Sequence, residues 1–211
     1  MAEGTVVLIA KLADKNATGI KLLDHHDVET TTAAGSGASM KQSIVLTAAG
    51  GKPTTTAGCA AAQLVEAGTN DIDYWVLDFD ATTKEYAVWN VVMPDNWDAS
   101  TLTYKVIWIT TSSTNTHTAA FGLAALGRGD SETMDTAYGT AIEVTDDATA
   151  TANQVLHTAE SAALTVGGTG AAGDWVAFRL YRDPANGSDD LNVDARVLAV
   201  RIEYGITALS A

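Results

Sequence analysis

Polar and apolar residues alternate most clearly in two segments near the C-terminus. The first, DWVAFRLYRD, places Val176 and Phe178 on one face of an extended chain and Arg179 on the other. The second, DARVLAVRIEY, repeats this period of two. A period of two is that of a half-buried β-strand. The sequence therefore predicts two strands here, paired as antiparallel neighbours across the loop PANGSDDLNV.

Apolar runs of strand length also fill the middle of the chain. DIDYWVLDFD and KEYAVWNVVM are joined by ATT, which predicts a hairpin, and TLTYKVIWITT and TAAFGLAALGRG follow. Apolar residues occur on both faces of the last two, as expected of strands that are covered on both sides. Weaker strand patterns lie near residues 142–145, 155–157 and 163–166. With few long helical patterns between them, these strands predict an all-β fold: a jelly-roll-like antiparallel β-sandwich of about eight strands.

The N-terminal segment has a different character from the rest of the chain. Its two short apolar runs, residues 6–10 and 20–23, are separated from the strand-rich part by TTTAAGSGAS, a low-complexity stretch that buries little surface. We expect residues 1–45 to form an extended arm for attachment or oligomer contacts and residues 46–211 to form the sandwich. A fragment of residues 70–205 is expected to fold without the arm.

Composition and charge exclude several classes of partner and of stabilising group. Hydrophobic residues make up 46% of the 211 residues, which is enough for a core. A net charge of -14 repels nucleic acid and anionic membrane surfaces. Cys59 is the single cysteine, so neither an intramolecular disulfide nor a cysteine zinc site forms. The run at 6–10 is too short for a signal peptide or a membrane span, and the chain is expected to fold in the cytosol.

Candidate metal and catalytic motifs are weak throughout. LLDHHDVE places His25 and His26 between Asp24 and Asp27, yet neighbouring side chains on a strand point to opposite faces. The Asp-rich turns VTDDATA and NGSDDLNVD resemble loose calcium loops without the spacing of an EF-hand. Solvated turns are the favoured interpretation of all three. No nucleophile motif or phosphate loop is present, so we expect no cofactor, no bound metal and no enzymatic activity.

The turn after the strand KEYAVWNVVM contains a tryptophan that has two interpretations. Pro94 removes a backbone donor and ends the strand, and Asp95-Asn96 favours a turn. Trp97 then either plugs one end of the sandwich, which is the favoured interpretation, or presents a ring on which a sugar stacks.

Several strings of this sequence resemble a group of small phage virion proteins found among head and tail genes. They are LDFDATTKEYAVWNVVMPDNWD, GLAALGRGDSETMDTAYGTA, LTVGGTGAAGDWVAFRLYRDP and LNVDARVLAVRIEY, and the resemblance covers roughly residues 52–204. It implies a jelly-roll protein of the virion, of a kind that tends to form trimers that decorate capsids or build fibre tips.

These observations predict a non-enzymatic structural component of a bacteriophage particle, assembled in the host cytoplasm. The leading hypothesis is a capsid decoration or cement protein that forms homotrimers and binds the major capsid protein or another virion protein. Outward-facing candidates for its subunit contacts are Val197 and Ala199, which lie opposite Leu198 and Val200, together with Arg179 and Arg201. The alternative is a tail- or head-fibre module that binds a host glycan through Trp97, Trp108 or Trp175.

Overall fold

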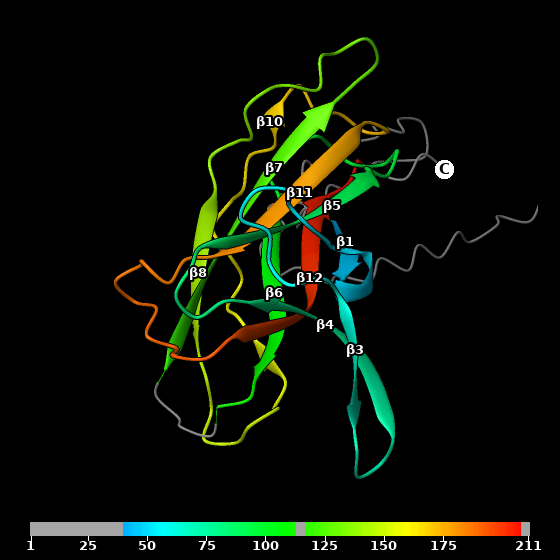
Figure 1. Ribbon diagram of the computed structural model, residues 1–211. Helices are drawn as coiled ribbons and strands as arrows, with labels where there is room; N and C mark the ends of the chain where they lie inside the picture. Colours follow the sequence, from blue (N-terminus) through cyan, green and yellow to red (C-terminus); the bar gives the residue numbers. More distant parts are fainter. Residues whose placement is uncertain (1–39, 113–116, 208–211) are drawn as a thin grey trace, which may run out of the picture. The chain divides into compact units, whose positions relative to one another are not determined.

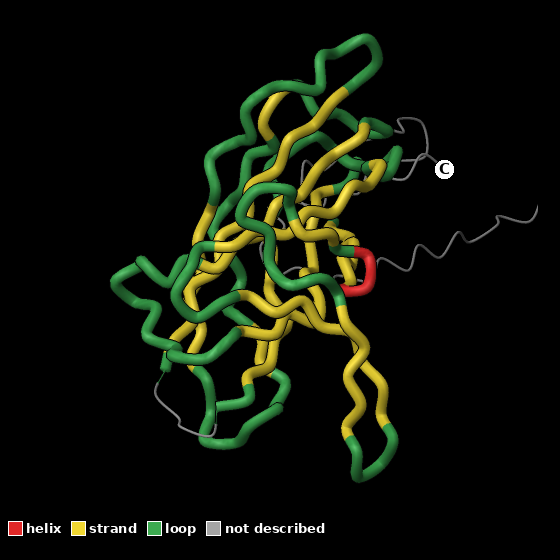
Figure 2. The backbone as a smooth tube through the Cα atoms, in the orientation of Figure 1, coloured by secondary structure: helices red, strands yellow, loops and turns green. Residues whose placement is uncertain are grey.

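The structure is a computed structural model that describes residues 40–112 and 117–207, and within them the chain forms a β-sandwich of two sheets (Figures 1 and 2). The first sheet has the order β3-β4-β12-β6-β9, with β1 also paired to β12, and the second has the order β10-β7-β11-β5-β2, with β8 paired to β7. The strands of the first sheet are β1 (Lys41–Thr47), β3 (Gln63–Ala67), β4 (Ile72–Phe79), β6 (Thr103–Thr110), β9 (Leu156–His157) and β12 (Ala195–Gly205). The strands of the second are β2 (Lys52–Pro53), β5 (Glu85–Val92), β7 (Thr118–Arg128), β8 (Ile142–Asp147), β10 (Gly167–Gly168) and β11 (Trp175–Arg182).

The predicted all-β sandwich fold is confirmed. A single turn of 3-10 helix, η1 (Ala48–Gly50), is the helical segment that Figure 2 draws within the described residues. Among the strands of the described residues, pairing is antiparallel except between β10 and β7, which are parallel. In this part of the chain, no helix is long and apolar enough to cross a membrane.

The core lies between the two sheets and is built from alternate residues of the strands. Tyr104 and Trp108 of β6 face Phe121 of β7, and the Trp108 and Phe121 rings meet edge to face with their centroids 5.5 Å apart. Val176 and Phe178 of β11 are also fully buried, as their alternation predicts. Burying such side chains stabilises a fold by about 1.5–3 kcal/mol each. The period of two therefore identified the inner faces of β6, β7 and β11 correctly.

The two predicted hairpins are wrong. β4 and β5 lie in different sheets, and so do β11 and β12, so each connection crosses from one sheet to the other. β11 pairs instead with β5 and β7, while β12 pairs with β1, β4 and β6. An apolar face is buried equally well by a strand beside it or by a strand across the core, because alternation fixes which face is inside and not which strand is adjacent.

A β-bulge in β12 overturns the predicted outward position of Val197. The pairing of β12 with β6 shifts register between Val197 and Ala199, so the alternation changes phase there. Val197 is fully buried in the core, and Leu198, predicted to face inward, is half-buried. Ala199 is half-buried and Arg201 is exposed, on the face away from the core residue Val200.

Most of the predicted N-terminal arm falls outside the described residues. This includes the apolar runs at 6–10 and 20–23 and the candidate metal ligands His25 and His26. Residues 41–45, which the prediction assigned to the arm, belong to β1, and β1 pairs with β12 along its whole length.

Candidate functional sites

Trp97 is a plug at one end of the sandwich, as favoured from the sequence. Its side chain is 3% exposed and packs in the hydrophobic core. The backbone N–H of Trp97 donates to the Pro94 carbonyl at 3.0 Å, which closes the predicted turn, and the N–H of Asp98 donates to the carbonyl of Gly205 at 3.1 Å. The turn is thereby tied to the end of β12.

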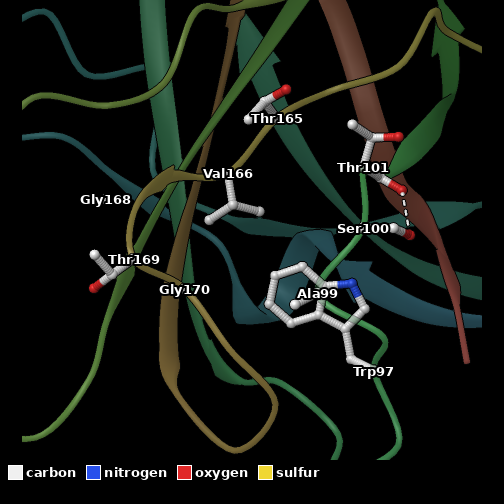
Figure 3. Close-up of a pocket in the computed structure, with 9 residues that line it drawn as sticks. All are labelled: Trp97, Ala99, Ser100, Thr101, Thr165, Val166, Gly168, Thr169 and Gly170. Atoms are coloured by element: carbon white, nitrogen blue, oxygen red, sulfur yellow. Dashed lines mark hydrogen bonds between the residues drawn. The ribbon is translucent and has the colours of Figure 1, made fainter. Parts of the chain in front are cut away.

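A pocket of about 590 Å³ lies above the Trp97 indole (Figure 3). The ring sits between the segment 99–101 and the loop 165–170, and the lining side chains are uncharged: Trp97, Ala99, Ser100, Thr101, Thr165, Val166 and Thr169, with Gly168 and Gly170. Ala99 and Gly168 both have positive φ, 57° and 76°, which turns the backbone around the opening. The Trp97 Nε1 is buried and has no hydrogen-bond partner within the described part of the chain. The pocket offers hydroxyl groups and an aromatic floor, but it offers no charge.

Trp108 is a core residue, which removes it as a platform for sugar stacking. It is fully buried, and its Nε1 donates to the Asp146 Oδ2 at 2.8 Å. Trp175 differs: it is the first residue of β11, is half-buried, and lies on the outer face of the second sheet between Val92 and Arg128 on the neighbouring strands.

The outer face of the second sheet holds a row of tyrosines and cations along β11, which we call the tyrosine row: Lys84, Tyr181, Tyr86, Arg179 and Tyr138. Tyr86 and Tyr181 are paired across β5 and β11, with ring centroids 5.6 Å apart. The Arg179 guanidinium carbon lies 5.1 Å from the centroid of Tyr86 and 4.1 Å from that of Tyr138. Lys84 Nζ lies 3.9 Å from the ring centroid of Tyr181. Each cation of the row therefore lies against at least one ring face, and the Tyr86 and Tyr181 rings between the two cations contact each other.

The sheet beneath the row is shaped to hold Tyr181. A side chain at Gly122 would bring a Cβ within 2.1 Å of the Tyr181 ring, so this glycine in the middle of β7 leaves the space that the ring occupies. The Tyr181 hydroxyl donates to Glu143 Oε1 at 2.8 Å, and burial raises the pKa of Tyr181, with a further rise from Glu143. Burial also raises the pKa of Tyr138, partly offset by the charge of Arg179. Both phenols stay protonated and neutral.

Arg179 and Arg201, both predicted as outward contact residues, have different surroundings. Arg201 Nη2 lies 2.6 Å from Glu203 Oε1 on its own strand, where both side chains point away from the core. Arg179 has no ion pair or hydrogen bond within the described residues, and its Nε is buried without a partner. Its contacts are the two tyrosine rings.

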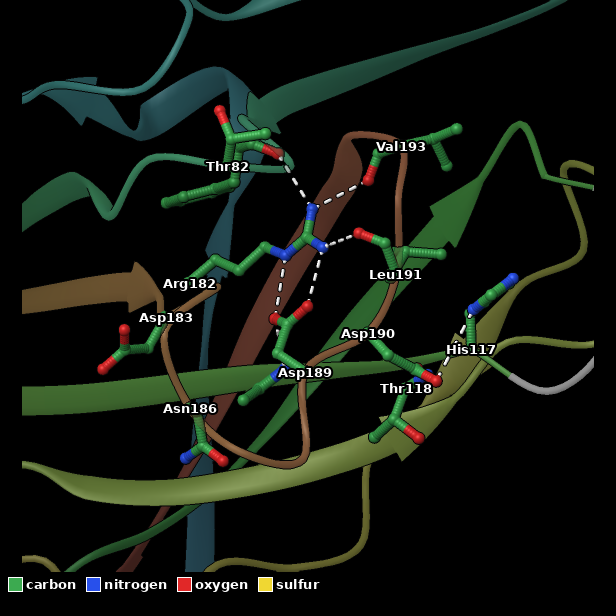
Figure 4. A network of polar contacts seen from close by, with 12 residues as sticks. Thr82, His117, Thr118, Arg182, Asp183, Asn186, Asp189, Asp190, Leu191 and Val193 are labelled. Atoms are coloured by element: carbon green, nitrogen blue, oxygen red, sulfur yellow. Dashed lines mark hydrogen bonds and ion pairs between the residues drawn. The ribbon is translucent and has the colours of Figure 1, made fainter.

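The Asp-rich turns have structural partners within the chain (Figure 4). Asp189 is paired with the fully buried Arg182, with Nε–Oδ2 and Nη2–Oδ1 distances of 3.0 and 2.8 Å. Asp190 accepts from the backbone N–H of Thr118 at 2.6 Å, and Asp147 accepts from the Thr118 hydroxyl at 2.6 Å. The described ranges contain no group of three or more His, Cys, Asp or Glu that could hold a metal ion.

Cys59 is held as a thiol. Burial, with a smaller effect from the charge of Glu85, raises its pKa to about 12. A nucleophilic cysteine needs the opposite shift, because the thiolate is the reactive form.

The β3–β4 hairpin belongs to the first sheet and projects from the sandwich (Figure 1). It carries exposed apolar side chains on both faces. Leu64 pairs with Trp75 on one face, and they are 52% and 44% exposed. Ile72, which is 57% exposed, pairs with Ala67 on the other face. Within the described residues, β3 lies at one edge of its sheet, and β9 lies at the other. A two-stranded hairpin with apolar residues on both faces is marginally stable in water without a partner.

Sequence reasoning missed two of these features. Tyr138 belongs to a polar loop with no periodicity, so nothing in the local pattern places its ring on Arg179. The exposure of Leu64 and Trp75 follows from the departure of the hairpin from the sheet, since β4 pairs with β12 only through residues 77–79. The alternation of Tyr181 and Arg179 on β11 did indicate that they share an outer face.

Burial affects the ionisation of several carboxyl groups on the sandwich. The pKa is raised, mainly by desolvation, for Asp78, Glu85 and Asp146. It is lowered by hydrogen bonds, chiefly from neighbouring threonines, for Asp80, Glu132 and Glu160. A raised carboxyl pKa means that the folded state binds the proton more tightly than the unfolded state does, so this contribution to stability increases as pH falls toward ordinary carboxyl values near about 4. The lowered values act in the opposite direction only below those ordinary values.

We therefore predict a higher melting temperature at roughly pH 5.5 than at roughly pH 7.5. Lower self-repulsion in a chain of charge -14 acts in the same direction. Differential scanning calorimetry of the full chain measures the shift. Asp146→Asn keeps an acceptor for Trp108 and removes one of the titrating groups, so its melting temperature is expected to depend less on pH. A melting temperature that is flat or that rises with pH contradicts the prediction.

Comparison with known proteins assigns no family. No protein-family model and no curated protein matches the chain. Among solved structures, the CBM22-2 xylan-binding domain of Paenibacillus barcinonensis Xyn10C shares 12% identity and a TM-score of 0.43, over 78% of this chain and 99% of that domain. The family 11 carbohydrate-binding module from Clostridium thermocellum shares 11% identity and a TM-score of 0.36, over 81% and 91%.

A cycloisomaltooligosaccharide glucanotransferase from Paenibacillus sp. shares 10% identity and a TM-score of 0.40 over 71% of this chain. The match covers 17% of that enzyme. At these identities and TM-scores, the likenesses assign neither a ligand nor an activity to this chain.

Proposed function

We propose that the protein is a non-enzymatic structural subunit of a bacteriophage particle, a capsid decoration or cement protein that forms homotrimers. The virion setting rests on the resemblance to small phage virion proteins. The observation that carries the self-association is the β3–β4 hairpin, with Leu64, Ile72 and Trp75 exposed on its two faces.

Self-association explains why apolar side chains are kept on a projecting hairpin. Each copy carries a net charge of -14, so copies repel one another and a stable contact needs apolar area to overcome this. The hairpin supplies that area on both faces, which allows one copy to contact two others around a closed ring. The major capsid protein, or another virion protein, is the second partner, and residues 1–45 are the proposed attachment segment.

The oligomeric state tests this proposal. We expect sedimentation velocity of the full chain at micromolar concentration to show a species of about three chains, and Leu64→Ser/Trp75→Ser to shift it to monomer while the folded spectrum is kept. Val92→Ser is the matched control, because Val92 is 65% exposed but lies on β5 of the other sheet. A monomeric wild-type chain, or a double variant that still forms trimers, overturns self-association through the hairpin.

The position of the chain on the particle is tested separately. A cryo-EM map of the intact phage is expected to show trimeric density for this sandwich on the outside of the capsid shell. Density at the neck or tail, or no density for the chain, overturns the decoration role.

A further inference from the structure

We propose that the outer face of the second sheet binds an acidic sugar, with Arg179 pairing the sugar carboxylate and Trp175 stacking on the sugar ring. This inference goes beyond self-assembly, and it concerns the sheet opposite to the one that carries the β3–β4 hairpin.

Arg179 is the exception among the arginines of this chain. The other four each lie within 4.0 Å of a carboxylate oxygen: Arg128 with Glu132, Arg182 with Asp189, Arg196 with Asp78, and Arg201 with Glu203. Acidic residues outnumber basic ones by 26 to 12, so carboxylate partners are abundant. Within the described residues, Arg179 nevertheless has none. A guanidinium without a carboxylate on a half-buried face is a site for an anion supplied from outside.

The two tyrosine rings hold this guanidinium in position. Tyr86 lies on the adjacent strand β5, and Tyr138 reaches Arg179 from the loop that follows β7. Stacking against ring faces satisfies the guanidinium plane without using its N–H donors in a hydrogen bond. The side chain is thus ordered before a ligand arrives, which lowers the entropic cost of binding a planar carboxylate in bidentate fashion.

The residues along the strand from Arg179 suit a sugar ring. Trp175 lies on the same face of β11, four residues from Arg179, and both are half-buried, while Ala177 between them is 2% exposed. Asn90 of β5 is paired with Ala177 of β11. It is exposed, and its amide can both donate and accept hydrogen bonds. A sugar presents C–H groups to the negative face of an indole or phenol ring and hydroxyl groups to an amide.

The charge on this face favours a sparsely charged ligand. Lys84, the other cation of the tyrosine row, is already paired with Asp183 at 2.7 Å. A nucleic acid carries one charge for about every 1.7 Å of duplex and needs several free cations. A single unpaired arginine matches an oligosaccharide with one carboxylate. A simpler role for Arg179 is to fix the Tyr138 loop to the sheet, which requires no ligand. The following experiment distinguishes this structural role from sugar binding.

The test is isothermal titration of the full chain with sialyllactose and with galacturonate, each of which carries one carboxylate, against the neutral counterparts lactose and galactose. We expect both acidic sugars to bind at least about tenfold more tightly than the neutral ones, and Arg179→Gln to remove this difference. Arg201→Gln, on the outer face of the first sheet, is the matched control and is expected to bind like wild type. Trp175→Leu is expected to bind acidic sugars more weakly than wild type does. Because Arg179 is kept, the affinity of this variant is still expected to fall as salt is added.

Three results overturn the proposal: no binding of either acidic sugar, equal affinity for acidic and neutral sugars, or unchanged affinity in Arg179→Gln. If Arg179→Gln lowers the melting temperature and wild type binds no sugar, the role of Arg179 is to fix the Tyr138 loop. The Leu64→Ser/Trp75→Ser variant is expected to bind acidic sugars like wild type, so a failure of self-association and a failure of sugar binding are distinguishable.

Discussion

Replacing Arg182 with Met is expected to destabilise the sandwich by about 3–5 kcal/mol. Arg182 is fully buried at the end of β11, and its guanidinium makes a bidentate pair with Asp189. The same group donates to the carbonyl of Val193 at 2.8 Å and to that of Leu191 (Figure 4). Methionine fills a similar volume but leaves the Asp189 carboxylate buried without its counter-charge and the carbonyls without a donor.

This network determines where the connection between β11 and β12 runs. Asp189 also accepts from the backbone N–H of Ala120 on β7 at 2.9 Å, so the arginine and the aspartate together fasten the loop 183–194 to the second sheet before the chain crosses to the first. Loss of Arg182 therefore affects the loop, the first residues of β7 and the start of β12.

Chemical denaturation monitored by tryptophan fluorescence measures the loss of stability. Arg201→Met is the matched control, since Arg201 is exposed and an ion pair at the surface contributes about 0–1 kcal/mol. The double variant Arg182→Met/Asp189→Leu is expected to be more stable than the sum of the two single losses predicts, because it leaves no uncompensated charge. An Arg182→Met variant that unfolds at the same denaturant concentration as Arg201→Met would show that the network is dispensable.

The sequence predicted the fold class and the inner faces of the main strands because a period of two follows directly from the pleat. It could not predict strand neighbours, because Val176 on β11 and Val200 on β12 face the same core from opposite sheets. The connection from β11 to β12 depends on Arg182. Nothing in the alternation of β11 distinguishes Arg182 from its neighbours, and its partner Asp189 lies in a loop. The bulge that buries Val197 has no signal in the alternation of its neighbours.

The candidate surfaces were predictable only in part. Arg179 and Trp175 fall on the outward face of a clearly alternating strand, so their position followed from the pattern. Tyr138, whose ring contacts Arg179, lies in an irregular loop. The path of a loop depends on tertiary contacts, which the periodicity of a sequence does not reveal. Trp97 and Trp108 were candidates because tryptophans are frequent at binding surfaces, but their rings fill the core, where an aromatic side chain contributes most to stability.

The sandwich depends on β1 more than the sequence pattern indicated. β1 pairs with β12 over seven residues, from Lys41 with Gly205 to Thr47 with Ala199. Leu46 is 2% exposed in the core, and the Thr47 carbonyl accepts from Trp89 Nε1 at 2.8 Å. That residues 70–205 fold alone stays a prediction, and β1 argues against it, because that fragment lacks β1 and leaves most of one edge of β12 open.

We predict that a fragment of residues 40–211 folds with a melting temperature close to that of the full chain, whereas a fragment of residues 51–211 is unfolded or molten. Removing a buried leucine alone costs about 2–5 kcal/mol, and the lost strand also removes a full set of backbone hydrogen bonds from β12 and the acceptor of Trp89. Together these losses approach the whole stability of a typical domain, about 5–15 kcal/mol. Circular dichroism and near-ultraviolet spectra of the two fragments decide the matter. A cooperative unfolding transition in the 51–211 fragment would show that β4 and β6 hold β12 without β1, and a coil spectrum for the 40–211 fragment would show that the first 39 residues are part of the folding unit.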